Sequence, residues 1–233
     1  MVFDRKIVHS HETFAILYMR HALLLMVILL TVATTMQAQP FVSGTLTFAG
    51  GKKIECQLSP PDDYRTKVIR YRLSDRSPVV EVPSDSLTYV SVSLGEGNTI
   101  DFEWLATTWD PDKKPSKKAW LLVVVHGYAT LYMKSEYHID YRDGVTATTW
   151  YTIGRSLPYF DYFLKKKGME VAVFFSKTSN ASGYLGLHTT LKKSVHRYLA
   201  DDPELVKQVD DKTYTHYDSE QIIQLYNQFM GIR

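Results

Sequence analysis

Histidines and carboxylates are the residues of this sequence best suited to catalysis or to metal binding. Outside the N-terminal region the histidines are His126, His138, His188, His196 and His216. No two of them stand four positions apart, and the eight positions between His188 and His196 correspond to roughly 12 Å along a helix. That separation is too long for one metal ion, so we predict solvated helix histidines and no metal site.

Three aspartates could supply a general acid and a general base. They are Asp140, Asp143 and Asp161. A retaining glycosidase needs two carboxylates about 5 Å apart, a distance that sequence spacing does not establish. Asp143 is better explained by the dipeptide Asp143-Gly144, a strong signal for a two-residue hairpin turn. No glycine-rich phosphate loop precedes a helix. The sequence therefore predicts no cofactor and favours a protein that is not an enzyme.

A third possibility is hydrolysis centred on His126. The apolar run 120–125 ends in His126-Gly127, as does the strand before the oxyanion loop of α/β-hydrolases. That fold also needs a Gly-x-Ser-x-Gly elbow on a strand-to-helix turn, and the sequence contains none. We therefore expect a hairpin turn or bulge with His126 at its tip, and the hydrolase hypothesis is the less favoured one.

Aromatic residues suggest a binding function instead. Trp109, Trp150, Tyr151 and Tyr159 stand in or near predicted loops and strand ends. Exposed aromatic side chains of β-rich proteins often hold sugars or peptides, because a rigid ring offers a large contact area. The alternative for each is a place in the core or at its rim. We take these four as the candidate ligand-binding residues.

The charge balance argues against nucleic acid as a partner. The chain has 27 basic and 25 acidic residues, with no block of five like charges. Binding to nucleic acid requires concentrated positive charge. The single cysteine, Cys56, excludes an internal disulfide and a multi-cysteine zinc site, and its place in an alternating strand predicts a buried, inert thiol.

Residues 1–38 have the features of a signal peptide. The uncharged apolar run 22–32 follows Arg20 and is followed by small and polar residues up to Ala38. A run of this length suits a secretory leader, whereas a spanning helix needs about 20 apolar residues. We predict cleavage after Ala38, translation from Met1 or Met19, and export to the periplasm or cell envelope; an uncleaved anchor is the alternative.

Residues 39–176 predict an antiparallel β domain. Apolar residues alternate along successive segments, and two glycine-containing loops, at 50–52 and 95–98, join strands whose parity requires an odd number of loop residues. In the first hairpin this places Phe48 opposite Ile54. Further strands are predicted at 69–73, 120–125 and 128–133, and in several later segments: 137–141, 145–153, 159–164 and 169–175.

Residues 177–233 predict a helical tail packed on the β domain. Leu187, Leu191 and Val195 form an apolar stripe at helical spacing, and Asp202-Pro203 is typical of a helix start. A last helix follows Asp218. The fold class is therefore α+β: an antiparallel β-rich body, either a sandwich or a partly open barrel, followed by two to three short C-terminal helices.

With these features the chain resembles a group of uncharacterised exported proteins of Bacteroidota. The resemblance lies in a leader ending in Ala38-Gln39, the strand and turn of 121–132, and the tail 198–205. Where the group often has Asp-Cys-Pro, this chain has Asp201-Asp202-Pro203. The resemblance implies an envelope location and no established activity, so it assigns no catalytic residue.

Together these observations lead to one leading hypothesis, an exported envelope protein that acts as a non-catalytic binding or structural module. The sequence does not identify its partner; a cell-envelope component, a glycan or a peptide is the expectation. The alternative is a carbohydrate- or peptide-binding domain that uses the exposed aromatic residues.

Overall fold

The computed structural model describes residues 41–134, 138–140, 147–149, 159–179 and 186–232. The chain divides into two units, Met1–Pro40 and Phe41–Arg233, and every described residue belongs to the second. The predicted signal peptide thus lies outside the described residues.

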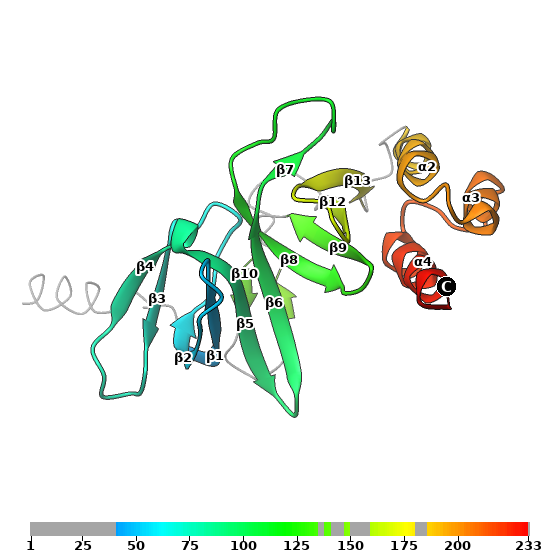
Figure 1. Ribbon diagram of the computed structural model, residues 1–233. Helices are drawn as coiled ribbons and strands as arrows, with labels where there is room; N and C mark the ends of the chain where they lie inside the picture. Colours follow the sequence, from blue (N-terminus) through cyan, green and yellow to red (C-terminus); the bar gives the residue numbers. More distant parts are fainter. Residues whose placement is uncertain (1–40, 135–137, 141–146, 150–158, 180–185, 233) are drawn as a thin grey trace, which may run out of the picture. The chain divides into compact units, whose positions relative to one another are not determined.

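Eleven of the described strands form one open sheet (Figure 1). In chain order the strands are β1 (Val42–Phe48), β2 (Lys53–Ser59), β3 (Val68–Arg72), β4 (Val80–Pro83), β5 (Leu87–Gly95), β6 (Asn98–Leu105), β7 (Thr107–Thr108), β8 (Ala119–Val125), β9 (Ala129–Lys134), β12 (Tyr159–Lys166) and β13 (Ala172–Ser179). They lie in the order β4-β3-β2-β1-β5-β6-β8-β9-β12-β13-β7. Among the strands that the structure describes, only the β7–β13 pair is parallel. Two short strands, β10 (His138–Asp140) and β11 (Ala147–Thr149), pair separately.

The first hairpin keeps the predicted parity in a different register. Leu46, not Phe48, lies opposite Ile54, so the predicted pairing is wrong. The three-residue loop is 49–51 instead of 50–52, and Gly51 takes the left-handed conformation at φ 81°. Because the loop is still odd, Leu46 and Ile54 share a face of the sheet, as the alternation requires.

The second hairpin corrects the expectation of an odd loop. Gly95 pairs with Asn98, and the two residues between them have positive φ, 53° at Glu96 and 80° at Gly97. Such a two-residue turn suits the twist of paired strands. A register shift between Ser93 and Gly95 restores the parity that the loop length alone would break.

The first six strands enclose an apolar core that is completed by two tryptophans. Trp104 on β6 and Trp120 on β8 are buried in it. The Trp120 indole donates to Ser84 Oγ at 2.9 Å, and the Trp104 indole donates to Asp85 Oδ1 at 2.9 Å. Both acceptors lie in the 3₁₀ turn η1 (Ser84–Ser86) that follows β4. The β4 end of the sheet therefore returns against β6 and β8, although the sheet stays open.

Cys56 lies at the edge of this core. Its side chain is buried, and burial raises the pKa of the thiol to about 11. The predicted burial of this cysteine is confirmed, and its inertness stays a prediction.

Three helices end the chain and cover one face of the later strands: α2 (Leu187–Tyr198), α3 (Pro203–Asp210) and α4 (Ser219–Ile232) (Figure 1). Helix α2 packs on β13, and α4 packs on β8 and β9. The predicted stripe of α2 is buried, and Asp202 Oδ1 accepts from Leu205 N at 3.1 Å as the cap of α3. The predicted α+β class, a β-rich body followed by short helices, is confirmed.

The described sheet has two edges, both short. Strand β4 has four residues, begins two positions after Pro78 and ends at Pro83, and strand β7 has two residues. The β3–β4 hairpin nevertheless carries four of the exposed large hydrophobic residues: Val68, Leu73, Val79 and Val80.

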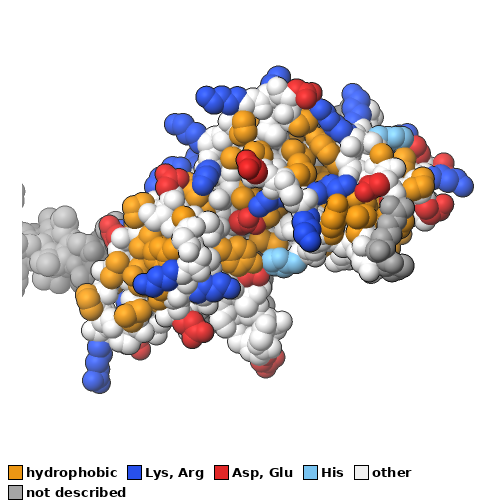
Figure 2. Space-filling model, in the orientation of Figure 1, with side chains coloured by type: hydrophobic (Ala, Val, Ile, Leu, Met, Phe, Trp, Pro, Cys, Tyr) orange, Lys and Arg blue, Asp and Glu red, His pale blue; other side chains and the backbone are white. Residues whose placement is uncertain are grey.

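Charges of both signs are interspersed on the face of the molecule that Figure 2 shows. Basic side chains alternate there with acidic side chains and hydrophobic surface.

Candidate functional site

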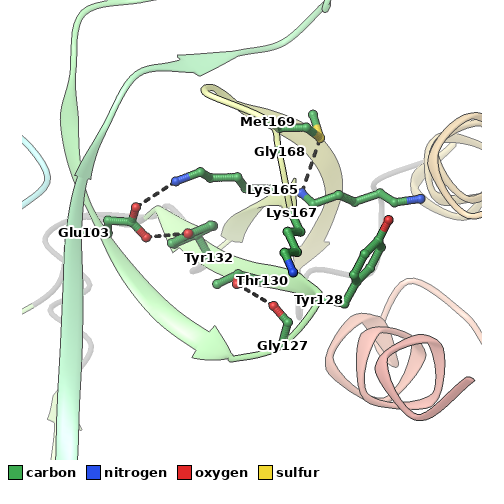
Figure 3. A pocket seen from close by; sticks show the side chains of 10 residues that line it. Glu103, Gly127, Tyr128, Thr130, Tyr132, Lys165, Lys167, Gly168 and Met169 are labelled. Carbon is green, nitrogen blue, oxygen red and sulfur yellow. Dashed lines mark hydrogen bonds and ion pairs between the residues drawn. The ribbon is translucent and has the colours of Figure 1, made fainter. Parts of the chain in front are cut away.

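A pocket lies where the β8–β9 turn meets the β12–β13 turn (Figure 3). Its volume is about 630 Å³, within the range of roughly 300–1,000 Å³ that is usual for small-molecule sites. It is lined by Glu103, Gly127, Tyr128, Thr130, Tyr132, Lys165, Lys166, Lys167, Gly168 and Met169. We call it the lysine pocket, after the three lysines in its wall.

The two turns are tied to each other directly. Lys167 N donates to Tyr128 O at 2.8 Å, and Lys166 lies opposite Ala129 in the β9–β12 ladder. Gly168 has a φ of 92°, a conformation that glycine adopts without strain. Lys165 and Lys166 at the end of β12, together with the turn that begins at Lys167-Gly168, therefore form one wall of the pocket.

Asn227 of α4 clamps the other wall. Its Oδ1 accepts from Ala129 N at 2.8 Å, and its Nδ2 donates to Ala129 O at 2.9 Å and to His126 O at 3.4 Å. A Cβ on Gly127 would lie 2.3 Å from Asn227 Nδ2, so only glycine fits beneath the amide. The helical tail thereby fixes the conformation of the turn that lines the pocket.

Glu103 forms the acidic end of the pocket. Lys165 Nζ donates to Glu103 Oε1 at 2.8 Å, and the Tyr132 hydroxyl donates to Glu103 Oε2 at 2.5 Å (Figure 3). Burial, followed by the hydrogen bond to Glu103, raises the pKa of Tyr132, so this hydroxyl stays protonated as a donor. The carboxylate is thus held by one cation and one neutral donor.

The ammonium group of Lys166 is held by contacts within the fold. Its Nζ donates to Tyr198 O at 3.0 Å and to Asp201 Oδ2 at 3.4 Å, and lies 4.9 Å from the centre of the Tyr226 ring. Tyr226 in turn donates its hydroxyl to Asp201. These contacts join β12 to the helices, so Lys166 is a structural cation beside the pocket.

Lys167 differs from both neighbours. Its side chain is exposed, and within the described part of the chain it has no hydrogen bond or ion pair. Three lysines against one carboxylate leave the lining net positive. The pocket therefore offers an uncompensated cation, together with the hydroxyl of Thr130 and the ring of Tyr128, which is 37% exposed.

His126 does not line this pocket. It lies in the turn between two antiparallel strands, as predicted, and its Nε2 is 3.1 Å from Asp101 Oδ2. A strand-turn-strand unit does not form the nucleophile elbow of a hydrolase. Among the residues that the structure describes, no group of three His, Cys, Asp or Glu side chains could hold a metal ion.

The helix histidines correct one expectation. His196 is exposed and its Nε2 lies 3.0 Å from Asp210 Oδ1, in keeping with a solvated position. Both ring nitrogens of His188, in contrast, are buried without a hydrogen-bond partner in the described structure. The prediction of a solvated His188 is wrong because the first turn of α2 faces the loop that carries His216.

Of the four aromatic residues singled out from the sequence, the structure describes Trp109 and Tyr159, and neither lines the lysine pocket. Trp109 is 54% exposed, and its ring stacks on Phe174 with the ring centres 4.3 Å apart. Tyr159 begins β12 opposite Ser179. Trp150 and Tyr151 lie outside the described residues, so their role stays a prediction.

Sequence reasoning overlooked the residues that form the pocket. The lysine run 165–167 is visible as a turn, but Glu103 and Tyr132 come from distant segments of the chain. Glu103 alternates with core residues along β6, and a charged residue at that position is also typical of an exposed strand face. Nothing in the sequence indicates that it meets Lys165.

Comparisons with known proteins assign no relative. No protein-family model, no curated protein and no solved structure matches this chain. Within the described ranges, the helices are all too short or too polar to cross a membrane. The geometry of the lysine pocket therefore carries the functional argument.

Proposed function

We propose that this chain is an exported, non-catalytic binding protein of the cell envelope, and that the lysine pocket holds its ligand. The observation that carries the proposal is a pocket of about 630 Å³ with fixed walls. Asn227 holds one turn, and the Lys167–Tyr128 backbone bond joins it to the other. A preformed site loses little entropy on binding.

The chemistry of the lining favours binding over catalysis. Tyr132 is kept neutral and donates to Glu103, while Glu103 is neutralised by Lys165. With its pKa raised, the Tyr132 hydroxyl is not poised near neutral pH to exchange a proton, which is what general acid–base catalysis requires. The polar groups of the pocket can instead orient a ligand through hydrogen bonds.

Binding is tested by thermal unfolding of the full chain with a panel of neutral saccharides, acidic saccharides and short peptides. We expect at least one class to raise the midpoint in a concentration-dependent manner. Tyr128→Ala should abolish that shift, whereas Tyr217→Ala, an exposed tyrosine outside the pocket, should retain it. A shift that survives Tyr128→Ala unchanged would place the ligand elsewhere.

Export is tested separately. The leader-like segment 1–38 motivates it, and N-terminal sequencing of the chain recovered from a Gram-negative host should find Gln39 as the first residue. Recovery of chains that begin only at Met1 or Met19 would contradict export by a cleaved leader.

A second candidate function rests on Trp109. Its half-exposed ring is held against Phe174 and contacts the edge of Phe163, so it offers a rigid surface for a sugar ring. In that case tryptophan fluorescence would change on titration with a neutral glycan, and Trp109→Ala would remove the change while Tyr128→Ala would not.

A further inference from the structure

We infer that the lysine pocket recognises an anionic group, a phosphate ester or a carboxylate, on a small polar ligand, and that Lys167 is the cation that selects it. This inference rests on the proposed function and specifies its ligand class. The argument begins with the charges that the fold leaves uncompensated.

Lys165, Lys166 and Lys167 are consecutive, but the fold uses them differently. The ammonium of Lys165 lies 2.8 Å from Glu103, and that of Lys166 lies 3.4 Å from Asp201. Both ion pairs are partly shielded from water, with side chains about a fifth exposed for the two lysines. Lys167 alone has an exposed ammonium with no anion near it among the described residues.

Lys167 lines the pocket, so its charge is available to a ligand there. Its backbone N–H is fixed on Tyr128 O at 2.8 Å, so the residue is anchored at the rim between the two turns (Figure 3). A cation on an anchored backbone loses less conformational freedom on binding than one on a loose loop. Charge-assisted hydrogen bonds to phosphate or carboxylate are about twice as strong as neutral ones.

The remaining lining suits the uncharged part of such a ligand. The Tyr128 ring is partly exposed at the pocket and offers a flat apolar surface, while Thr130 offers a hydroxyl that can donate and accept. A volume of about 630 Å³ accommodates a hexose with one acidic substituent. The expected ligand is therefore a phosphorylated or carboxylated sugar-sized molecule.

Glu103 carries a negative charge in the pocket and therefore disfavours an anionic ligand. Its replacement should change the affinity for an anion in the direction opposite to the replacement of Lys167. In the unliganded pocket Glu103 forms an ion pair with Lys165, and it repels a second negative charge. Glu103→Gln keeps an acceptor for Tyr132 but removes that repulsion and frees Lys165. Affinity for an anion should then rise, whereas affinity for a neutral ligand should not.

The test uses NMR of the full chain with selective glycine labelling. The chain has twelve glycines, and only one follows lysine (Gly168) and only one follows histidine (Gly127). Labelling glycine with ¹⁵N, and either lysine or histidine with ¹³C at the carbonyl, therefore yields one assigned amide on each wall of the pocket. The other glycines are internal controls.

Four probes are titrated: glucose 6-phosphate, glucuronate, glucose and inorganic phosphate. We expect Gly127 and Gly168 to shift with the first two and not with glucose; a shift with inorganic phosphate as well would show that the anionic group itself is recognised. Lys167→Gln should weaken binding of glucose 6-phosphate at least about tenfold. Lys52→Gln, an exposed lysine in the first hairpin, should leave it unchanged, and Glu103→Gln should strengthen it about twofold or more.

The outcomes separate the two proposals. If glucose shifts the two amides as strongly as glucose 6-phosphate does, the anionic class is wrong while a ligand site remains. If Lys167→Gln binds glucose 6-phosphate as the parent does, read at the Gly127 amide, while the glycine amides other than Gly168 stay unchanged and so show an intact fold, Lys167 is not the selecting cation. If no probe shifts either amide, and the thermal panel is also silent, both proposals fail.

Discussion

Removing the side chain of Asn227 should destabilise the chain far more than its half-buried position on α4 suggests. Asn227→Ala deletes the two hydrogen bonds to the backbone of Ala129, at 2.8 and 2.9 Å. Ala129 is fully buried, so water does not replace them. A lost hydrogen bond costs about 0.5–1.5 kcal/mol, and a buried group left unpaired costs about 1–3 kcal/mol. We therefore expect the free energy of unfolding to fall by about 2–4 kcal/mol.

Urea denaturation of the full chain measures this loss, with an unchanged m-value as evidence that the same surface unfolds. Gln228→Ala is the matched control, because Gln228 is the next residue of the same helix and is exposed. Its cost should stay within about 0.5 kcal/mol. A loss for Asn227→Ala as small as that of the control would refute the clamp.

Gly127→Ala provides a second, independent check of the same clamp. The new Cβ would lie 2.3 Å from Asn227 Nδ2 and 2.4 Å from its Cγ, so the amide must leave and its hydrogen bonds must break. The two substitutions should then cost similar amounts singly and little more together. A double-mutant cycle should show a coupling of at least about 1.5 kcal/mol; simple additivity would mean that the amide moves aside freely.

Three further predictions concern other parts of the fold. Burial, followed by the charge of His188, lowers the pKa of His216 below its ordinary value of 6.5, and Asp218 opposes this only in part. Because the unfolded chain then binds the proton more readily than the folded chain, stability should fall as the pH drops below about 6.5. His216→Gln should therefore flatten the dependence of the unfolding free energy on pH between 7.5 and 5.5. Cys56, with its pKa raised to about 11, should resist thiol reagents at pH 8 until the chain is unfolded, and rapid labelling of the native chain would contradict its burial. Trp120→Phe, which removes the bond to Ser84 from a fully buried ring, should cost about 1–3 kcal/mol in urea denaturation, whereas Trp109→Phe should cost under about 1 kcal/mol; equal losses would mean that the core does not depend on the η1 contact.

Local patterns in the sequence were sufficient for most of the sheet. Alternation predicted the strands around Leu46 and Ile54 and those around Val92 and Ile100, because one buried face imposes a period of two residues. The same logic erred in the turns. It treated loop length as the only control of parity, whereas the structure restores parity at 95–98 by a register shift, which leaves no sign in the spacing of apolar residues.

The pocket could not be predicted from local sequence patterns, because its parts come from separate segments of the chain. Its parts are Glu103 on β6, the β8–β9 turn and the lysines at the end of β12, and Asn227 on α4 holds the β8–β9 turn. Each is unremarkable in its own segment. Only the order of strands in the sheet, with β6, β8, β9 and β12 as neighbours, makes them adjacent, and pairwise strand order is set by long-range packing.

The two edges of the sheet determine how readily the chain aggregates at high protein concentration. An uncovered edge strand can pair with strands of further chains and so begin a fibre. The β3–β4 hairpin increases this tendency to aggregate because it exposes hydrophobic side chains such as Leu73 and Val79. Pro78 stands two positions before the four-residue strand β4 and Pro83 is its last residue, and neither offers an amide proton to an incoming neighbour. At the opposite edge β7 is only two residues long. The described sheet can therefore stay open without pairing with strands of other copies of the chain. Replacing either proline should first cause aggregation on storage.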